Sequence, residues 1–321
     1  MVFTLRGPPT FKINSGVSNT WKFIGFLTLQ ISVVIVAAFF NILAIGVLIH
    51  GRKKLMKNHF YIIVSNLVVG TSLKAFVEIG FNIPFSIFSD YLPWGHFPME
   101  YEMFIFYTSI FADYGVLFFF MALSVNCCWS ASRSEDTRKS PMRITVLTCV
   151  MSWLCSIVVA FLFFMCQCQY NYSTTAKMYY HRCFIDTELI QIMLGCLIYL
   201  PHTCVIVVLI LYYVIMSSSR RLRQYKKERS SVEINLFRQN LTAFDIYTAS
   251  IFAVFILSFV DPGEHFFDII FIENLLNLSI AAVYPICLLA MPGEMRGIIT
   301  PKRTNFQPRV GSLNVNNKKV T

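Results

Sequence analysis

The stretch WKFIGFLTLQISVVIVAAFFNILAIGVLIHGRKK, residues 21–54, decides the class of fold. Between Lys22 and His50 it carries no ionisable side chain, and the basic cluster Arg52, Lys53 and Lys54 follows directly. A helix of about 20 apolar residues crosses a bilayer core that is about 30 Å thick. The stretch therefore predicts a transmembrane helix that ends at a positively charged membrane surface.

The apolar pattern of this stretch recurs along the whole chain. Hydrophobic residues make up 56% of the 321 residues and charged residues only 14%, whereas about 25% of a typical soluble domain is charged. No apolar segment with a cleavage site precedes the first span, which is expected to act as its own insertion signal. We predict an all-α bundle of seven transmembrane helices, at about residues 21–50, 60–88, 101–130, 144–165, 188–216, 241–260 and 267–291.

The distribution of positive charge predicts the orientation of these spans. Of the 27 lysine and arginine residues, 21 lie on one side of the predicted membrane, five lie on the other, and Lys74 lies within a span. Basic loops remain in the cytoplasm, so residues 1–20 are expected outside, residues 21–291 form the membrane domain, and residues 292–321 form a cytoplasmic tail. The basic face suits anionic membrane lipid, and no nucleic-acid partner is expected.

The outer loop QCQYNYSTTAKMYYHRCF, residues 167–184, carries features of an extracellular segment. Asn171 begins an N-glycosylation sequon, whereas the sequons at Asn240 and Asn277 fall on the cytoplasmic side and within a span. The oxidising compartment permits a disulfide in this loop. We favour the pair Cys168 and Cys183, with Cys166 as an alternative partner.

One residue in each of several spans resembles the marker residues of rhodopsin-like G-protein-coupled receptors. These are Asn41 in FFNILAIGVLI, Trp153 in VMSWLCSIVV, Pro201 in IYLPHTCVIVV and Pro285 in AAVYPICLLA. SNLVVGT in the second span and ALSVN in the third are similar to motifs of the same family. PGEMRG after the seventh span resembles the start of the family's short cytoplasmic helix. The resemblance covers nearly the whole chain and implies a receptor with helix-packing roles for these four markers.

The departures from the family pattern are equally informative. Asn126, Cys127 and Cys128 stand where the family has an acidic residue, an arginine and an aromatic residue, and Thr71 stands where it has an aspartate. The sixth span lacks the family's tryptophan and proline. The third span does not open with a cysteine, which favours a bridge within the outer loop. The chain is most similar in these respects to the divergent nematode chemosensory serpentine receptors.

Ionisable residues within the spans indicate a candidate binding site. Such residues are costly at bilayer depth and usually face the interior of the bundle. Lys74 and Glu78 share one face of the second span, Asp113 lies in the third, and Glu273 and Asn277 lie in the seventh. These three spans are neighbours in the family architecture, so we expect the charges to form one cluster. Nearby aromatic residues that could line it are Tyr107, Phe111 and Tyr114.

Three interpretations of this cluster remain open at the level of sequence. Lys74 could form a structural ion pair with Glu78 or with Asp113. The excess of acids over bases could instead create a pocket for a small ligand that carries an amine or several hydrogen-bond donors, because unpaired buried carboxylates attract cations. Glu273 could also face outer water and take no part.

Competing classes of protein fit the same residues less well. The seventh span has no lysine to hold retinal as in microbial rhodopsins, and no converging catalytic groups indicate an enzyme. A membrane transporter or channel subunit is the alternative, although no internal repeat supports it. We therefore predict a plasma-membrane receptor for a small extracellular molecule that needs no cofactor. The resemblance implies a heterotrimeric G protein as its cytoplasmic partner.

Overall fold

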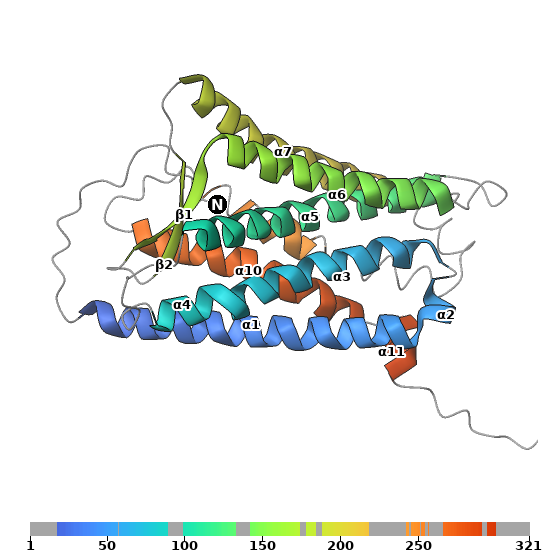
Figure 1. Ribbon diagram of the computed structural model, residues 1–321. Coiled ribbons are helices and arrows are strands. Elements are labelled where there is room, and N and C mark those ends of the chain that lie inside the picture. Colours follow the sequence, from blue (N-terminus) through green and yellow to red (C-terminus); the bar gives the residue numbers. More distant parts are fainter. Residues whose placement is uncertain are drawn as a thin grey trace, which may run out of the picture.

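The fold is described from a computed structural model, in which a bundle of long helices dominates (Figure 1). The described residues are 18–56, 58–88, 99–132, 142–173, 178–183, 188–217, 266–290 and 294–299, together with 242–243, 245–250, 252–253 and 256. The predicted sixth span, residues 241–260, therefore lies only partly within the described residues, and the described part is helical. Residues 300–321, most of the predicted cytoplasmic tail, and residues 1–17 of the predicted outer segment lie outside them.

Long helices occupy the positions predicted for six of the spans. They are α1 (Ser18–His50), α3 (Phe60–Val77) with its extension α4 (Ile83–Phe88), α5 (Met99–Ser132), α6 (Met142–Met165), α7 (Glu188–Ser217) and α10 (Phe266–Ala290). Within the described residues, four helices are long and apolar enough to cross a membrane, namely Ile24–His50, Phe60–Phe88, Glu100–Asn126 and Met142–Met165. Shorter apolar stretches occur at Gly195–Val208 in α7 and Asn274–Ala290 in α10.

The second span changes its helical geometry near its middle. A π-helical segment, η1 (Glu78–Asn82), separates α3 from α4. Pro84 follows this segment and has no amide hydrogen to donate to the carbonyl of Gly80, which weakens the regular α-helical pattern there. Short π-helical insertions are frequent at functional sites because they redirect the side chains of one turn.

Short elements close the two ends of the bundle. At one end, β1 (Cys168–Ser173) and β2 (Met178–Cys183) pair as an antiparallel hairpin in which Asn171 faces Tyr180 across the ladder. At the opposite end lie α2 (Arg52–Leu55) and α11 (Glu294–Ile299), as Figure 1 shows. A Cβ atom at Gly51 would clash with Ile298, so glycine allows α11 to pack closely at the end of α1. The short helix implied by PGEMRG is thus present as α11.

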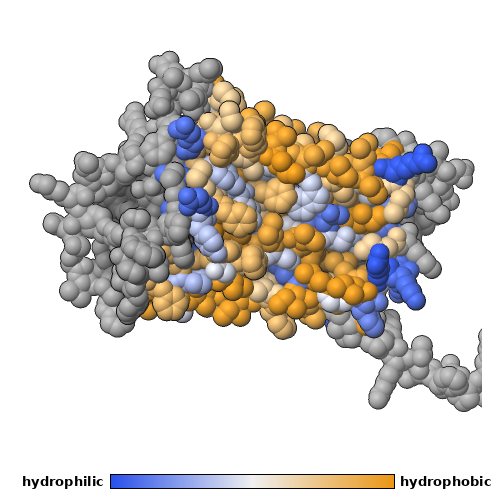
Figure 2. Space-filling model, in the orientation of Figure 1, coloured by the Kyte–Doolittle hydropathy of each residue, from blue (hydrophilic) through white to orange (hydrophobic). Residues whose placement is uncertain are grey.

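The bundle buries its central helices and exposes apolar side chains on its outer face. Helix α5 contacts α3, α6 and α7, while α1 contacts α3 and α10. The outer face carries large exposed apolar residues on α1 and α6, and Figure 2 shows a broad hydrophobic band between more hydrophilic ends. Apolar side chains on the exterior suit contact with lipid tails. A helix can lie against lipid because it satisfies its own backbone hydrogen bonds. The exposed apolar residues of α1 and α6 include Ile35, Phe39, Ile42, Leu147, Ile157 and Phe161.

Candidate ligand site

Lys74 of α3 and Asp113 of α5 form an ion pair between the two central helices of the bundle. Their side chains are 10% and 21% exposed, so both charges are largely removed from solvent. Each partner offsets the large desolvation cost of the other. Of the pairings left open by the sequence, the structure therefore joins Lys74 to Asp113.

Glu78 lies one turn beyond Lys74 in the π-helical segment and contacts neutral amides. Gln30 Nε2 of α1 donates to Glu78 Oε2 at 3.1 Å, and Asn82 Nδ2 donates to Glu78 Oε1 at 3.0 Å. The side chain of Glu78 is half-buried, and Asn82 is buried. Sequence reasoning missed Gln30, although an amide side chain within an apolar span is itself a signal of an interhelical contact.

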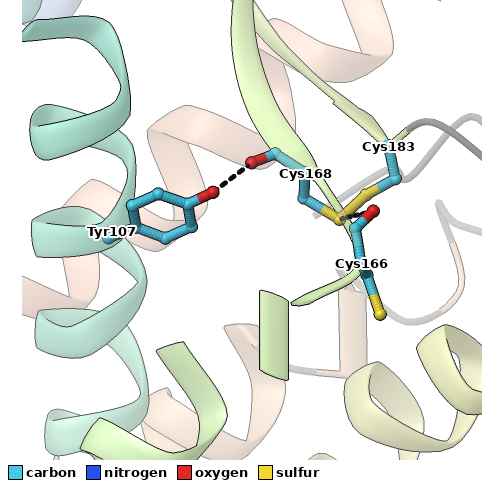
Figure 3. Close-up of a disulfide and its surroundings, with 4 residues drawn as sticks. All are labelled: Tyr107, Cys166, Cys168 and Cys183. Atoms are coloured by element: carbon cyan, nitrogen blue, oxygen red, sulfur yellow. Dashed lines mark hydrogen bonds between the residues drawn. A yellow bond between two sulfur atoms is a disulfide. The ribbon is translucent and has the colours of Figure 1, made fainter. Parts of the chain in front are cut away.

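Tyr107 contacts the hairpin of β1 and β2 and, among the described residues, makes no hydrogen bond to Lys74, Asp113 or Glu78. Its hydroxyl donates to the backbone carbonyl of Cys168 at 2.9 Å, and its ring packs edge-on against Phe164. Cys168 and Cys183 form a disulfide, the pair favoured from the sequence, and Figure 3 shows the tyrosine beside it. Cys166 is a buried free thiol whose pKa is raised by burial.

The other predicted site residues are placed less completely. Glu273 and Asn277 lie on α10, but their side chains fall outside the described residues. Phe111 stacks on Trp153 with ring centroids 4.9 Å apart. The hydroxyl of buried Tyr114 donates to the carbonyl of Leu197 in α7 at 3.2 Å. The structure therefore brings Lys74, Asp113 and Glu78 together, while Phe111 and Tyr114 make packing contacts with α6 and α7.

The marker residue Asn41 connects three helices through its side-chain amide. Asn41 Nδ2 donates to the carbonyls of Ala37 at 2.8 Å and Ala281 at 3.0 Å. Asn41 Oδ1 accepts hydrogen bonds from the hydroxyls of Thr71 at 2.6 Å and Ser72 at 3.2 Å. Helices α1, α3 and α10 are thereby joined at one buried point.

Each of the two marker prolines leaves one backbone carbonyl of its helix without its usual donor. A proline has no amide hydrogen for the carbonyl four residues earlier, so Pro285 frees the carbonyl of Ala281 and Pro201 frees that of Leu197. The amide of Asn41 reaches the first carbonyl and the hydroxyl of Tyr114 reaches the second. Neighbouring helices thus satisfy the backbone groups that the prolines leave free, as the bilayer interior requires.

The marker Trp153 fixes α6 against the centre of the bundle. Its indole Nε1 donates to Asn66 Oδ1 of α3 at 2.9 Å. A Cβ atom at Gly115 would lie 3.0 Å from the indole ring, so the absence of a side chain there allows the close approach. The role of Asn66, which stands in the SNLVVGT motif, emerges only once its partner is known.

The residues of the third span that depart from the family pattern lie near the end of α5. Asn126 is half-buried near the end of α5, while the side chains of Cys127 and Cys128 fall outside the described residues. Nearby, Phe120 stacks on Tyr247 with centroids 4.1 Å apart and meets Tyr284 edge-on. Aromatic packing therefore occupies the core beside this region.

These helices define the chain as an all-helical, multi-pass membrane protein with the seven-helix fold of the rhodopsin-like receptors, which confirms the predicted fold class. The structure is similar to squid rhodopsin, with a TM-score of 0.70 and 13% sequence identity over 93% of this chain and 88% of that chain. At this identity the likeness establishes the fold. No protein-family model and no curated protein matches the sequence.

Proposed function

We propose that the protein is a plasma-membrane receptor for a small extracellular molecule and that it signals to a heterotrimeric G protein. The observation that carries the proposal is the acidic side chain of Glu78, held within a rhodopsin-like bundle beside the ion pair of Lys74 and Asp113. Intramembrane ionisable residues usually serve function and not packing alone. The remaining candidates for the same site are Tyr107, Glu273 and Asn277, and no catalytic role is assigned to any of these residues.

The rhodopsin-like fold favours a receptor over the alternative of a transporter or channel subunit. The likeness extends over 93% of the chain, whereas no feature of the described residues specifically favours a transport path. The departures at Asn126, Cys127 and Cys128 support our narrower proposal of a divergent chemosensory receptor. Coupling would then rely on other cytoplasmic groups, such as the basic loop SSSRRLRQYKKERSS at residues 217–231.

The placement of charge on the structure supports an external N-terminus. The exposed basic residues Arg52, Lys53, Lys54 and Arg296 lie on α2 and α11, at the end of the bundle opposite the hairpin that carries Asn171 (Figure 1). Basic segments of this kind remain in the cytoplasm and attract anionic lipid.

Epitope tags test this orientation. An N-terminal tag should be accessible to antibody on intact cells, and a C-terminal tag should become accessible only after permeabilisation. Asn171→Gln should remove a glycan, seen as a mobility shift, while the matched changes Asn240→Gln and Asn277→Gln should leave the mobility unchanged. A C-terminal tag that antibody reaches on intact cells would contradict the receptor orientation.

A ligand screen in cells tests the function directly. Cells that express the protein should respond to at least one small extracellular molecule with a concentration-dependent change in calcium or cyclic nucleotide. Cells that carry the empty vector should not respond. A membrane current or solute flux without any G-protein signal would instead support the transporter or channel alternative.

A further inference from the structure

Among the described residues, Glu78 makes no ion pair, and its two hydrogen-bond partners are the neutral amides of Gln30 and Asn82. Lys74, the nearest cation along the chain, already pairs with Asp113. The positive charge one turn away is therefore largely neutralised. The carboxylate of Glu78 is left with hydrogen bonds but with no counter-charge of its own.

A second acceptor adjoins this carboxylate. Among the parts of the chain that the structure describes, no hydrogen-bond donor reaches the buried Asn82 Oδ1, and the residue is only 8% exposed. This oxygen belongs to the same amide group whose Nδ2 lies 3.0 Å from Glu78 Oε1. A buried acceptor without a partner carries a substantial free-energy cost, which a bound donor would remove.

The remaining acceptor capacity matches one kind of donor. Each carboxylate oxygen can accept about two hydrogen bonds, and each oxygen of Glu78 accepts one from an amide. One further position therefore remains on each oxygen, in addition to Asn82 Oδ1. A primary ammonium group carries three N–H donors and one positive charge, so its number of donors matches the number of free acceptor positions and its charge matches that of the carboxylate.

Spacing along the second span explains why these groups lie together. Glu78 and Asn82 are four residues apart, as the first and last residues of η1, so both lie on one side of the helix, where Glu78 also meets Gln30 of α1. Glu78 is half-buried as a residue, so it is not fully enclosed by the protein. Hard divalent metals prefer more oxygen ligands and more than one carboxylate, which makes an organic cation the better match.

We propose that Glu78 and Asn82 bind the primary ammonium group of a small organic amine. The inference rests on the proposed receptor function. It specifies the chemical class of the ligand and the residues that recognise the ligand's charged group. In this arrangement Gln30 orients the carboxylate, and the Lys74–Asp113 pair lies alongside as a neutral structural neighbour. A quaternary ammonium ion has no N–H donor and would leave Asn82 Oδ1 unsatisfied, so it should bind much more weakly.

The test measures binding to the purified full-length protein in lipid nanodiscs, independently of signalling. The probes are ethylammonium and 2-phenylethylammonium, each compared with its trimethylated counterpart, and the readout is the shift in thermal unfolding temperature across a concentration series. The primary amines should stabilise the wild type, and the trimethylated ions should require more than about tenfold higher concentration. Glu78→Gln should abolish the shift, and Asn82→Ala should weaken binding by about tenfold or more.

A matched control and the unliganded stability distinguish this site from a purely structural one. Glu100→Gln makes the same chemical change at an exposed position on α5 and should leave amine binding unchanged. Unliganded Glu78→Gln should be at least as stable as the wild type, because the change removes an uncompensated charge. Gln30 keeps its acceptor, and the Asn82 amide can turn to present its unpartnered Oδ1 to the new NH2 group.

Three results would overturn the inference: no stabilisation of the wild type by either primary amine at millimolar concentration, equal binding of the primary and trimethylated probes, or an unchanged shift in Glu78→Gln. The inference and the receptor function can fail separately. If a ligand that is not an amine signals in cells and Glu78→Gln responds normally, the receptor function stands and this site is wrong. If primary amines bind through Glu78 and no ligand signals, the site stands and the receptor function is wrong.

Discussion

Asp113→Asn is expected to reduce the amount of protein at the cell surface and to lower its unfolding temperature. The amide has nearly the shape of the carboxylate, but it leaves the buried ammonium of Lys74 without its counter-charge. Breaking a buried ion pair by removing one partner typically costs about 3–5 kcal/mol. Surface expression of a tagged protein and thermal unfolding of the solubilised protein measure the effect.

The double substitution Lys74→Met with Asp113→Asn tests whether this loss belongs to the pair. Methionine fills a similar volume without a charge, so the second change should restore most of the surface expression and stability. Glu100→Gln, an exposed acid on the same helix, serves as the matched control and should have little effect.

The opposite result would assign Asp113 a different role. Normal expression of Asp113→Asn, combined with selective loss of the response to a ligand, would place this carboxylate in direct contact with the ligand. Normal expression with a normal response would remove it from both roles. Either result would contradict the structural role that we assign to the ion pair.

The predicted helices agree closely with the structure because length and apolar composition determine a membrane span. The second predicted span, residues 60–88, coincides with α3, η1 and α4 together, and the fifth begins at the same residue as α7. The π-helical segment within the second span could not be predicted, since an apolar pattern does not specify whether a turn is α or π. Gly80 within the segment and Pro84 just after it are local signals of a weakened helix, but they do not specify a π turn.

The candidate site was predictable in composition but not in pairing. Lys74, Glu78 and Asp113 were predicted to lie together because each stands deep within a span, where an isolated charge is costly. The choice of Asp113 as the partner of Lys74 depends on how α3 and α5 face each other, which the sequence does not specify. Gln30 and Asn82 were missed because neutral amides carry no charge and attract attention only once their acceptor is known.

The marker prolines illustrate a similar limit. A resemblance to known receptors identified Pro201 and Pro285, and chemistry alone says that each frees one carbonyl. The sequence cannot say which side chain reaches that carbonyl, because the donor comes from another helix. Tyr114 was considered as a ligand-lining aromatic, yet its hydroxyl serves the carbonyl that Pro201 leaves free.

Asn41→Ala is expected to lower the unfolding free energy by roughly 2–3 kcal/mol, because it leaves a buried backbone carbonyl without a donor. Thr71 and Ser72 each retain a hydrogen bond to the carbonyl of Val68 after the change. The carbonyl of Ala281 loses the side-chain donor that replaces the backbone bond removed by Pro285. The main cost should therefore arise at Ala281.

A double-mutant cycle with Pro285→Ala isolates that cost. Alanine at 285 restores an amide hydrogen to the carbonyl of Ala281, so Asn41→Ala should be about 1 kcal/mol or more less damaging in the Pro285→Ala background than in the wild type. Thr28→Ala, which removes an exposed hydroxyl that bonds only to the carbonyl of Ile24 at 2.7 Å, is the control and should have little effect. Thermal unfolding in nanodiscs measures all four members of the cycle. Strict additivity of the two substitutions would show that Asn41 stabilises the bundle through its contacts with α3, and that the carbonyl freed by Pro285 is satisfied in another way.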